Sequence, residues 1–410
     1  MAGSEGSKAK PRIDPRLLTA TVEKPQKIGE HQTSLRIGIP REAALQENRV
    51  ALTPRAVGVL IANGHEVYVE TKAGQGAQFS DHQYSENGAI ILYEPQELYG
   101  RADIIAKITP LNEQELEYLR PHQTIISAVH MGQMQADYLK ALMQKSITAI
   151  GYEFIVGSDG SVPFMKIMSQ IAGIASVHIA AEMLSAPAGG KGLLFGGITG
   201  VPPIRVGVIG AGTVGRYATM SCIGLGADVR VIDEEIPQLQ ELERSLPHRI
   251  STSLSSPDIV EEITRWADVL IGAAYIKGYR APLVVTEDMV MEMREGSVII
   301  DVAIDQGGCI ETSRVTNHRN PAFVVHGVKH YCVPNIASRV ARTGAMSISN
   351  MLMPLLLKIG QNGGVKSSLG REASITSGIY VYHKHITQRA LARVFDLDFM
   401  DIELLYAADM

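Results

Sequence analysis

The stretch RVGVIGAGTVG, residues 205–215, decides the fold of this chain. A short apolar strand runs into a glycine-rich turn, and a helical stretch begins directly after the turn. Each glycine has its own physical role, since Gly210 permits the tight turn, Gly212 lets the backbone approach a pyrophosphate, and Gly215 lets the helix pack closely on the strand. Free N–H groups and the dipole at the start of the helix then favour an anion. The pattern therefore predicts a dinucleotide-binding βαβ unit.

An acidic residue at the end of the next strand supports this interpretation. Asp233 closes VRVID and lies 23 residues after Gly210, near the spacing of about 20 that is typical of such units. A carboxylate there hydrogen-bonds a ribose 2′-hydroxyl and repels a 2′-phosphate, and Glu234 and Glu235 strengthen the repulsion. The expected cofactor is therefore NAD rather than NADP. A glycine-rich turn that holds no ligand is the alternative, but it explains neither the flanking strand and helix nor the acid.

Strands and helices alternate on both sides of this unit. The runs that read as strands are LRIGI, HEVYVE, GAIIL, ADIIAKI, QTIISAV and SITAIGY before it, and then RVGVIG, DVRVID, ADVLIGA, GSVIIDVA and AFVVHGV. Such alternation predicts parallel sheets that are covered by helices on both faces. The expected fold class is α/β, with two Rossmann-like doubly wound domains.

Two long helical stretches, residues 164–184 and 345–359, indicate how the two domains are connected. They flank the second series of strands, which suggests that the chain returns to its first domain. We expect a NAD-binding Rossmann domain at 164–339, inserted into a discontinuous substrate and catalytic domain formed by 35–163 and 340–405. The active site is expected between the two domains.

Composition excludes several classes of protein. The 410 residues are 45% hydrophobic, and the formal charge of −5 lacks the basic footprint of a nucleic-acid binder. No run reaches the ~20 uninterrupted apolar residues that a membrane span needs. The three cysteines lie far apart, which disfavours a metal site and indicates a reducing compartment. Residues 1–34 lack the apolar core of a secretory signal and read as a flexible N-terminal extension. We expect a cytoplasmic protein.

Four polar residues are poorly explained by packing alone. Arg49 lies in QENRVALTP near a helix start, and Lys107 interrupts the apolar strand ADIIAKI. His130 ends the strand TIISAVH, and Asp305 follows VIIDVAI. Strand ends are where α/β sheets bind ligands. A lysine inside a strand needs an anion or a path to solvent, whereas a core role and a catalytic role both fit His130.

At these positions the sequence resembles the alanine dehydrogenases, a family that includes the NAD-binding subunit of proton-translocating transhydrogenase. IGIPREAALQENRVALTP, GADVRVID, VIIDVAIDQGGCIETSR and VHGVKHYCVPN carry the resemblance, which extends from about Leu35 to about Phe399, or 365 of 410 residues. The closing part, SGIYVYHKHITQRALARVFDLDF, is similar to the family's last strand and helix. The resemblance implies reversible oxidative deamination, in which L-alanine, water and NAD⁺ give pyruvate, ammonium and NADH.

The resemblance also implies roles for the four polar residues. Arg49 matches an Arg that binds the substrate carboxylate, and Lys107 is the only Lys on the strand that carries the family's substrate-binding Lys; the Arg fork and the Lys point charge both suit a carboxylate. His130 matches the acid/base, whose ordinary pKa range serves both directions near neutrality. Asp305 matches the acid that orients the water or amino group and balances the forming cation.

Further expectations follow from the same resemblance. Ser169 and Asn335 match cofactor-binding positions near the nicotinamide ribose and amide. The partners implied are a small amino acid and its 2-oxo acid, with no nucleic acid and no membrane. A homo-oligomer is expected, since the family is commonly hexameric.

The chain departs from the family pattern in the substrate region. Thr109 stands where the second Lys of K-V-K is usual, Ala128 replaces an aromatic residue before the catalytic His, and Gln170 replaces a Glu. Lys166 and Arg339 add positive charge nearby. Two alternatives therefore stay open: a dehydrogenase for another amino acid or an opine- or saccharopine-type imine, and a non-catalytic NAD-binding subunit like that of transhydrogenase.

Overall fold

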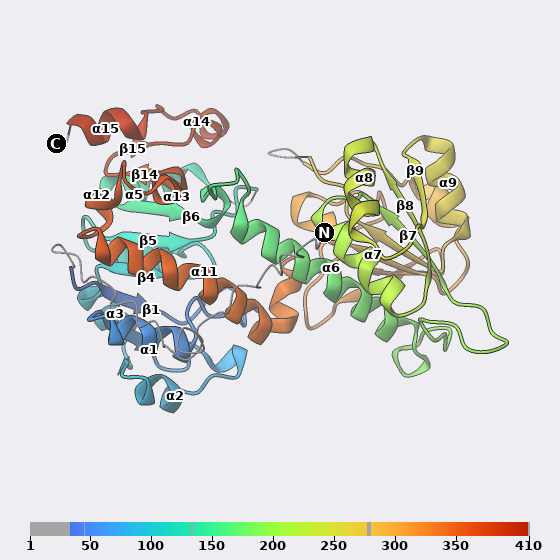
Figure 1. Cartoon of the computed structure of the whole chain (residues 1–410), viewed down its shortest axis with the longest axis horizontal. Coiled ribbons are helices and arrows are strands. Elements are labelled where there is room, and N and C mark those ends of the chain that lie inside the picture. The colour runs from blue at the N-terminus through green and yellow to red at the C-terminus, as the bar shows by residue number, and fades with distance from the viewer. Residues whose placement is uncertain (1–32, 45, 133, 277–279, 409–410) are drawn as a thin grey trace, which may run out of the picture.

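The computed structural model describes residues 33–408, except 45, 133 and 277–279, so nearly all of the expected N-terminal extension lies outside the described residues. The described chain forms two lobes, each built around a mainly parallel sheet (Figure 1). Two long helices, α6 (Pro163–Leu184) and α11 (Ala341–Gln361), run from one lobe toward the other.

The first lobe contains an eight-stranded sheet in the order β15-β14-β6-β5-β4-β1-β2-β3. Its strands are β1 (Arg36–Ile39), β2 (Glu66–Glu70), β3 (Ile90–Leu92), β4 (Ile104–Ala106), β5 (Thr124–Ser127), β6 (Thr148–Gly151), β14 (Ile379–Tyr382) and β15 (His385–Ile386). Strands β1 to β6 are parallel, whereas β14 pairs antiparallel with β6. The chain thus leaves this sheet after β6 and returns to it more than two hundred residues later.

The second lobe contains a seven-stranded sheet in the order β12-β13-β11-β10-β7-β8-β9. Its strands are β7 (Arg205–Ile209), β8 (Asp228–Asp233), β9 (Ser251–Leu254), β10 (Val269–Gly272), β11 (Val298–Asp301), β12 (Ala322–Val325) and β13 (Val328–Tyr331). All of these strands are parallel except β12. The expected α/β class with two doubly wound, Rossmann-like sheets is confirmed.

Helices cover both faces of each sheet and supply its two apolar cores. The first lobe carries α1 (Pro54–Ala62), α2 (Asp81–Glu86), α3 (Pro95–Arg101), α4 (Glu113–Tyr118), α5 (Ala136–Gln144), α12 (Val365–Ser368), α13 (Ala373–Gly378), α14 (Arg389–Phe395) and α15 (Ile402–Ala408). The second carries α7 (Thr213–Gly224), α8 (Ile236–Ser245), α9 (Pro257–Trp266) and α10 (Glu287–Met291). Because polar strand ends are left at the rim of such a layered core, the sites for chemistry lie there.

The second sheet differs from the sequence expectation at its two edges. AFVVHGV was expected as one strand, but His326 and Gly327 both have positive φ and turn the chain into the hairpin β12–β13. Two consecutive positive φ angles are what a two-residue hairpin turn requires. The short polar strand β9 has no apolar pattern because it is a partly exposed edge strand, so the sequence offered no signal for it.

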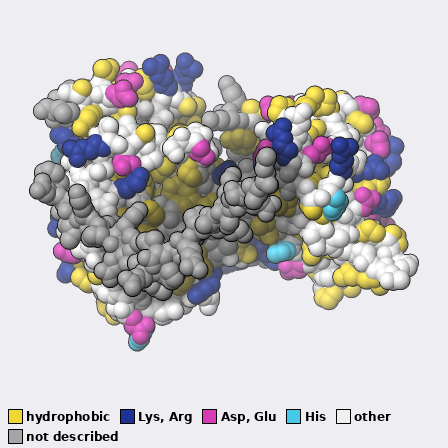
Figure 2. Space-filling model, in the orientation of Figure 1, with side chains coloured by type: hydrophobic (Ala, Val, Ile, Leu, Met, Phe, Trp, Pro, Cys, Tyr) yellow, Lys and Arg dark blue, Asp and Glu magenta, His cyan; other side chains and the backbone are white. Residues whose placement is uncertain are grey.

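Helix α6 also qualifies an expectation. By length and composition it is apolar enough to cross a membrane, with a mean hydropathy of 1.4 over its best 18 residues, but half of that window is buried inside the protein. Core helices of globular proteins have this character. On the face shown in Figure 2, the Lys and Arg side chains are scattered over both lobes and form no single basic field.

Candidate active site

The glycine-rich turn after β7 leaves an open surface on which a ligand can bind. Gly210 has a φ of +98°, and a Cβ there would lie 2.5 Å from the carbonyl oxygen of Ala273. A Cβ at Gly215 would lie 1.8 Å from the carbonyl oxygen of Gly210, so only glycine lets α7 approach the turn this closely. A Cβ at Gly212, in contrast, would meet no atom within 4 Å. The turn is thus packed on its inner side and open at Gly212.

The start of α7 and the end of β8 complete this binding surface. No side chain caps the N-terminus of α7, so its first N–H groups remain available to an anion. Asp233 ends β8, and its carboxylate accepts hydrogen bonds from the backbone N–H of Ala211 at 2.6 Å and of Glu235 at 2.8 Å. These contacts fix the acid beside the turn. The open cradle and the uncapped helix fit a dinucleotide pyrophosphate, and Asp233 fits its ribose.

A buried ion pair lies between the two lobes. Arg49, in the loop between β1 and α1, donates from Nε and Nη2 to the two carboxylate oxygens of Glu47, at 2.8 and 2.7 Å. The exposed fractions of the two side chains are only 6% and 1%. Burial alone would raise the pKa of Glu47, but the ion pair and hydrogen bonds with Arg49 outweigh it and lower that pKa. The pair is therefore ionised near neutral pH.

Asn335 connects this ion pair to the second lobe. Its side-chain oxygen accepts from Nη2 of Arg49 at 2.6 Å, and its side-chain nitrogen donates to Glu47. Its backbone N–H donates to the carboxylate of Asp305 at 3.0 Å. Asn335 adopts a left-handed conformation, with φ of 57°, which a short amide side chain tolerates. One residue thus contacts both members of the ion pair and Asp305.

Asp305 belongs to the short helical turn that follows β11. The residue is exposed to solvent, yet the protein packed around its carboxylate raises the pKa of Asp305 by burial. The N–H of Asn335 and the charges of His130 and Arg49 act in the opposite direction and lower this pKa. The carboxylate therefore faces a partly enclosed, solvent-containing space. Because the charges of His130 and Arg49 both influence the pKa of Asp305, the three side chains lie near one another.

His130 follows β5 in a strained backbone conformation, with φ of +47°. The carboxylate of Glu153, just after β6, accepts from the backbone N–H of Val129 at 2.9 Å and of His130 at 3.1 Å. The His130 side chain is half-buried. Glu153 therefore holds the turn that presents the imidazole at the carboxyl edge of the first sheet.

Lys107 has a different environment from the other predicted residues. It follows β4, its side chain is 0% exposed, and its ammonium pairs with Glu115 and lies 3.7 Å from Glu42. Glu115 also accepts from the Tyr99 hydroxyl at 3.1 Å. The expected contact between Lys107 and a substrate is not met in this conformation, because no part of the side chain is accessible. Both anionic partners of Lys107 lie inside the first lobe.

The remaining predicted positions are less engaged. Ser169, half-buried in α6, makes no side-chain hydrogen bond with the residues that the structure describes, whereas its neighbour Met168 accepts from Nη1 of Arg49 at 3.2 Å. Among the departures, Thr109 donates to Glu42 at 2.6 Å and Arg339 pairs with Glu182. The other three, Ala128, Gln170 and Lys166, are half-buried, half-buried and exposed respectively.

Sequence reasoning missed three acids of the first lobe: Glu42, Glu47 and Glu153. Each lies just after a strand of the parallel sheet or in the loop that follows it, on the edge where Arg49 and His130 were predicted. Glu42 and Glu47 are both buried. An acid near a predicted buried cation is a signal that could have found Glu47, since buried charges need partners.

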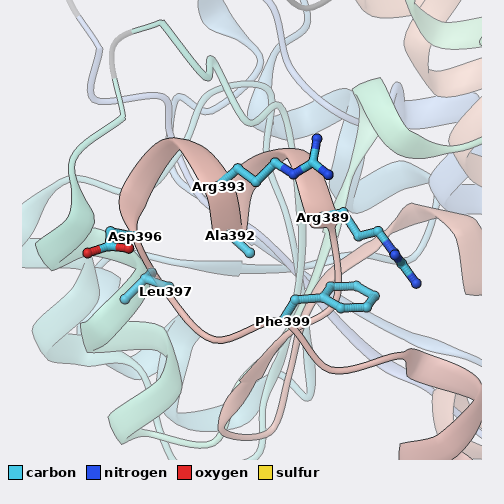
Figure 3. A pocket seen from close by; sticks show the side chains of 6 residues that line it. All are labelled: Arg389, Ala392, Arg393, Asp396, Leu397 and Phe399. Atoms are coloured by element: carbon cyan, nitrogen blue, oxygen red, sulfur yellow. The ribbon is translucent and has the colours of Figure 1, made fainter.

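A separate cavity of about 310 Å³ shares no residue with this region. It lies against α14 and the segment after it, lined by Arg389, Ala392, Arg393, Asp396, Leu397 and Phe399 (Figure 3). The guanidinium of Arg389 lies 4.7 Å from the centre of the Phe399 ring. This cavity contains none of the predicted site residues.

Comparisons with known proteins identify the family of this sequence. Residues 38–172 match the family described as alanine dehydrogenase/PNT, N-terminal domain, and residues 176–389 match its C-terminal domain. The chain is 38% identical to the alanine dehydrogenase of Halomonas elongata over 367 residues, which cover 90% of this chain and 98% of that protein. Alanine dehydrogenase 2 of Staphylococcus aureus strain USA300 is 37% identical over 370 residues, with coverages of 90% and 99%.

Solved structures give the same picture. A structure of L-alanine dehydrogenase superposes with a TM-score of 0.83 at 36% identity and covers 88% of this chain and 99% of its own. The transhydrogenase of Sinorhizobium meliloti superposes with a TM-score of 0.73 at 23% identity, over 87% of this chain and 99% of its own, and shares the fold.

Proposed function

The chain belongs to the alanine dehydrogenase/PNT family, and from this premise we propose that it catalyses the NAD-dependent oxidative deamination of L-alanine. L-Alanine, water and NAD⁺ are converted to pyruvate, ammonium, NADH and a proton, and the reaction is reversible. The observation that carries this proposal is the contact chain Arg49–Asn335–Asp305, which joins a cation of one lobe to an acid of the other.

The residues of the first lobe hold the substrate and move its protons. Arg49 binds the substrate carboxylate through charge-assisted hydrogen bonds. His130 removes a proton from the reacting amine or hydroxyl and returns it in the reverse direction. Lys107, which pairs with Glu115 and Glu42, supports the site from within the first lobe and does not touch the substrate.

Asp305 faces the carbon at which positive charge develops. Its carboxylate stabilises the iminium that forms when the substrate loses hydride, and it orients the water that attacks this carbon. When bound, the dinucleotide supplies the hydride acceptor.

The second lobe would hold the cofactor. Gly210, Gly212 and Gly215 form the cradle for the pyrophosphate, and Asp233 accepts from the ribose hydroxyls and repels a 2′-phosphate. Ser169 is assigned to the nicotinamide end, since its neighbour Met168 contacts Arg49. Asn335 shares this end, with its amide also engaged by the ion pair.

A second candidate is a dehydrogenase for a larger amino acid. Ala128 favours it, because a small half-buried residue just before His130 leaves room that an aromatic ring would fill. A NAD-binding subunit without catalysis of its own is the third candidate.

We further propose that the protein works in the cytoplasm as a homo-oligomer. Sedimentation of the purified protein would test the oligomeric state.

A panel of amino acids separates these candidates. The purified enzyme is given NAD⁺ with each of L-alanine, glycine, L-serine, L-valine, L-lysine and an N-carboxyalkyl amino acid, and NADH absorbance is followed. Turnover with L-alanine at the highest kcat/KM is the expected result. A higher kcat/KM for a larger substrate would transfer the assignment to the second candidate, and no turnover with any of them, together with intact NADH binding, would transfer it to the third.

A further inference from the structure

The guanidinium of Arg49 presents two usable faces, and the protein already occupies one of them. Nε and Nη2 form the side-on face, and both donate to the carboxylate of Glu47 in a bidentate arrangement. The backbone N–H of Arg49 donates to the same carboxylate at 2.9 Å. A substrate carboxylate therefore meets a guanidinium whose side-on face is filled.

Glu47 is not an exchangeable partner. Removing it from a buried pair leaves an uncompensated charge, which is strongly unfavourable. The loop is also fixed to the second lobe, since Ser338 accepts from the N–H of Asn48 at 2.9 Å and donates to the carbonyl of Gln46 at 2.7 Å. A substrate that competed for the side-on face would have to break all of these contacts.

The end-on face of Arg49 has weaker partners. Nη1 donates to the sulfur of Met168 at 3.2 Å, and Nη2 donates to the amide oxygen of Asn335 at 2.6 Å. A thioether is a weak acceptor and an amide oxygen is neutral, whereas a carboxylate accepts charge-assisted bonds that are roughly twice as strong as neutral ones. A substrate carboxylate is therefore the stronger acceptor for this face.

We infer that Glu47 is a positioning residue that fills the side-on face of Arg49, so that the substrate carboxylate is received only on the Nη1/Nη2 face, beside Met168 and Asn335. This inference rests on the proposed function, because it concerns the same substrate. It gives the carboxylate a single orientation. It also ties that orientation to Asp305, because the amide that yields to the substrate belongs to the residue whose N–H holds the Asp305 carboxylate.

Two variants test the inference, one that keeps the size of Glu47 and one that keeps its charge. Glu47→Gln keeps the shape and removes the charge, which weakens the bonds to the side-on face and lets a carboxylate compete for it in a second, unproductive mode. Glu47→Asp keeps the charge but is one methylene shorter. Propionate, which is alanine without its amino group, serves as the inert carboxylate. Its dissociation constant from the enzyme–NADH complex is measured by calorimetry, alongside kcat and KM for L-alanine.

In Glu47→Gln, propionate should bind at least threefold more tightly while kcat falls at least tenfold. In Glu47→Asp, the propionate dissociation constant should stay within twofold of wild type and kcat should fall less. General damage to the site would weaken both binding and turnover, so weaker or unchanged propionate binding in Glu47→Gln overturns the inference. If Glu47→Gln fails to bind NADH, Glu47→Asp decides, and an unchanged kcat in it overturns the inference.

These measurements separate the inference from the proposed function. Propionate binding is read without turnover, so it judges Glu47 even if wild type oxidises no alanine. Failure of the wild type in the substrate panel would instead count against the proposed function alone.

Discussion

The two lobes share one topology and use it in opposite ways. The first five strands of each sheet lie in the same relative order, β3-β2-β1-β4-β5 and β9-β8-β7-β10-β11, so each sheet has a switch point beside its first strand. In the second lobe this point is open at Gly212. In the first lobe Glu42 fills it, accepting from the N–H of Ile108 at 2.6 Å and of Thr109 at 3.2 Å. A glycine leaves room for a ligand's anion, whereas a glutamate supplies the protein's own.

One buried acid of the second lobe is stabilised differently from the paired acids of the first. In the first lobe, Glu47 pairs with Arg49, and Glu115 with Lys107. In the second lobe, the buried Asp301 at the end of β11 has only neutral partners, the N–H and thiol of Cys309 and the hydroxyl of Ser313. Burial raises the pKa of Asp301 to about 6. Ionisation of Asp301 is thus disfavoured by burial, whereas the ion pair with Arg49 favours the ionised form of Glu47.

The largest expected effect is on the chemical step and belongs to the first lobe. His130→Ala should lower kcat by about 10²–10⁴-fold, because it removes the acid/base. NADH affinity, measured by the fluorescence of the bound cofactor, should remain within twofold of wild type, since the cofactor cradle lies in the other lobe. A kcat close to that of wild type would exclude His130 from proton transfer.

Two glycines of the second lobe provide a matched pair. Gly212→Ala adds a methyl where no protein atom lies within 4 Å, so the free energy of unfolding should change by less than about 0.5 kcal/mol while the NADH dissociation constant rises on the order of tenfold. Gly215→Ala forces a methyl to within 1.8 Å of a backbone oxygen and should lower that free energy by about 2 kcal/mol. Chemical denaturation and NADH titration measure both. Equal stability of the two variants would contradict the distinction between the open and the packed side of the turn.

The last expected effect does not involve catalysis and concerns the pH dependence of stability. Because the folded-state pKa of Asp301, about 6, lies above its ordinary value of 3.8, ionised Asp301 destabilises the fold at neutral pH, and this cost disappears as the pH falls from about 7 to 4. Asp301→Asn should therefore be more stable than wild type by up to about 3 kcal/mol at pH 7.5. The advantage should shrink toward zero near pH 4.5 in denaturation curves. A difference that does not vary with pH would mean that Asp301 is not the titrating group.

The local patterns were predictable from the chain alone. The glycine turn, Asp233 and the strand–helix alternation of both lobes are visible in the sequence because each depends on residues that are close in the chain and on a repeat in hydrophobicity. The edge strand β9 and the β12–β13 hairpin were missed because a polar edge and a His-Gly turn carry little periodic signal.

The partners of the charged residues were not predictable in this way. The sequence indicates that Lys107 needs an anion, but only the fold shows that Glu115 and Glu42 satisfy it inside the first lobe. Arg49 and Asn335 are 286 residues apart in the chain and hydrogen-bonded in space.

The sequence by itself therefore determined the α/β class, the doubly wound lobes and a set of candidate residues for the chemistry, from which Glu42, Glu47 and Glu153 were missing. Tertiary structure alone decided which of those residues face one another, which face of the Arg49 guanidinium has only uncharged partners, and which cation is neutralised within the core. The reason is physical. Backbone geometry and hydrophobic periodicity are set over a few neighbouring residues, whereas the partner of a buried charge is set by how distant segments pack.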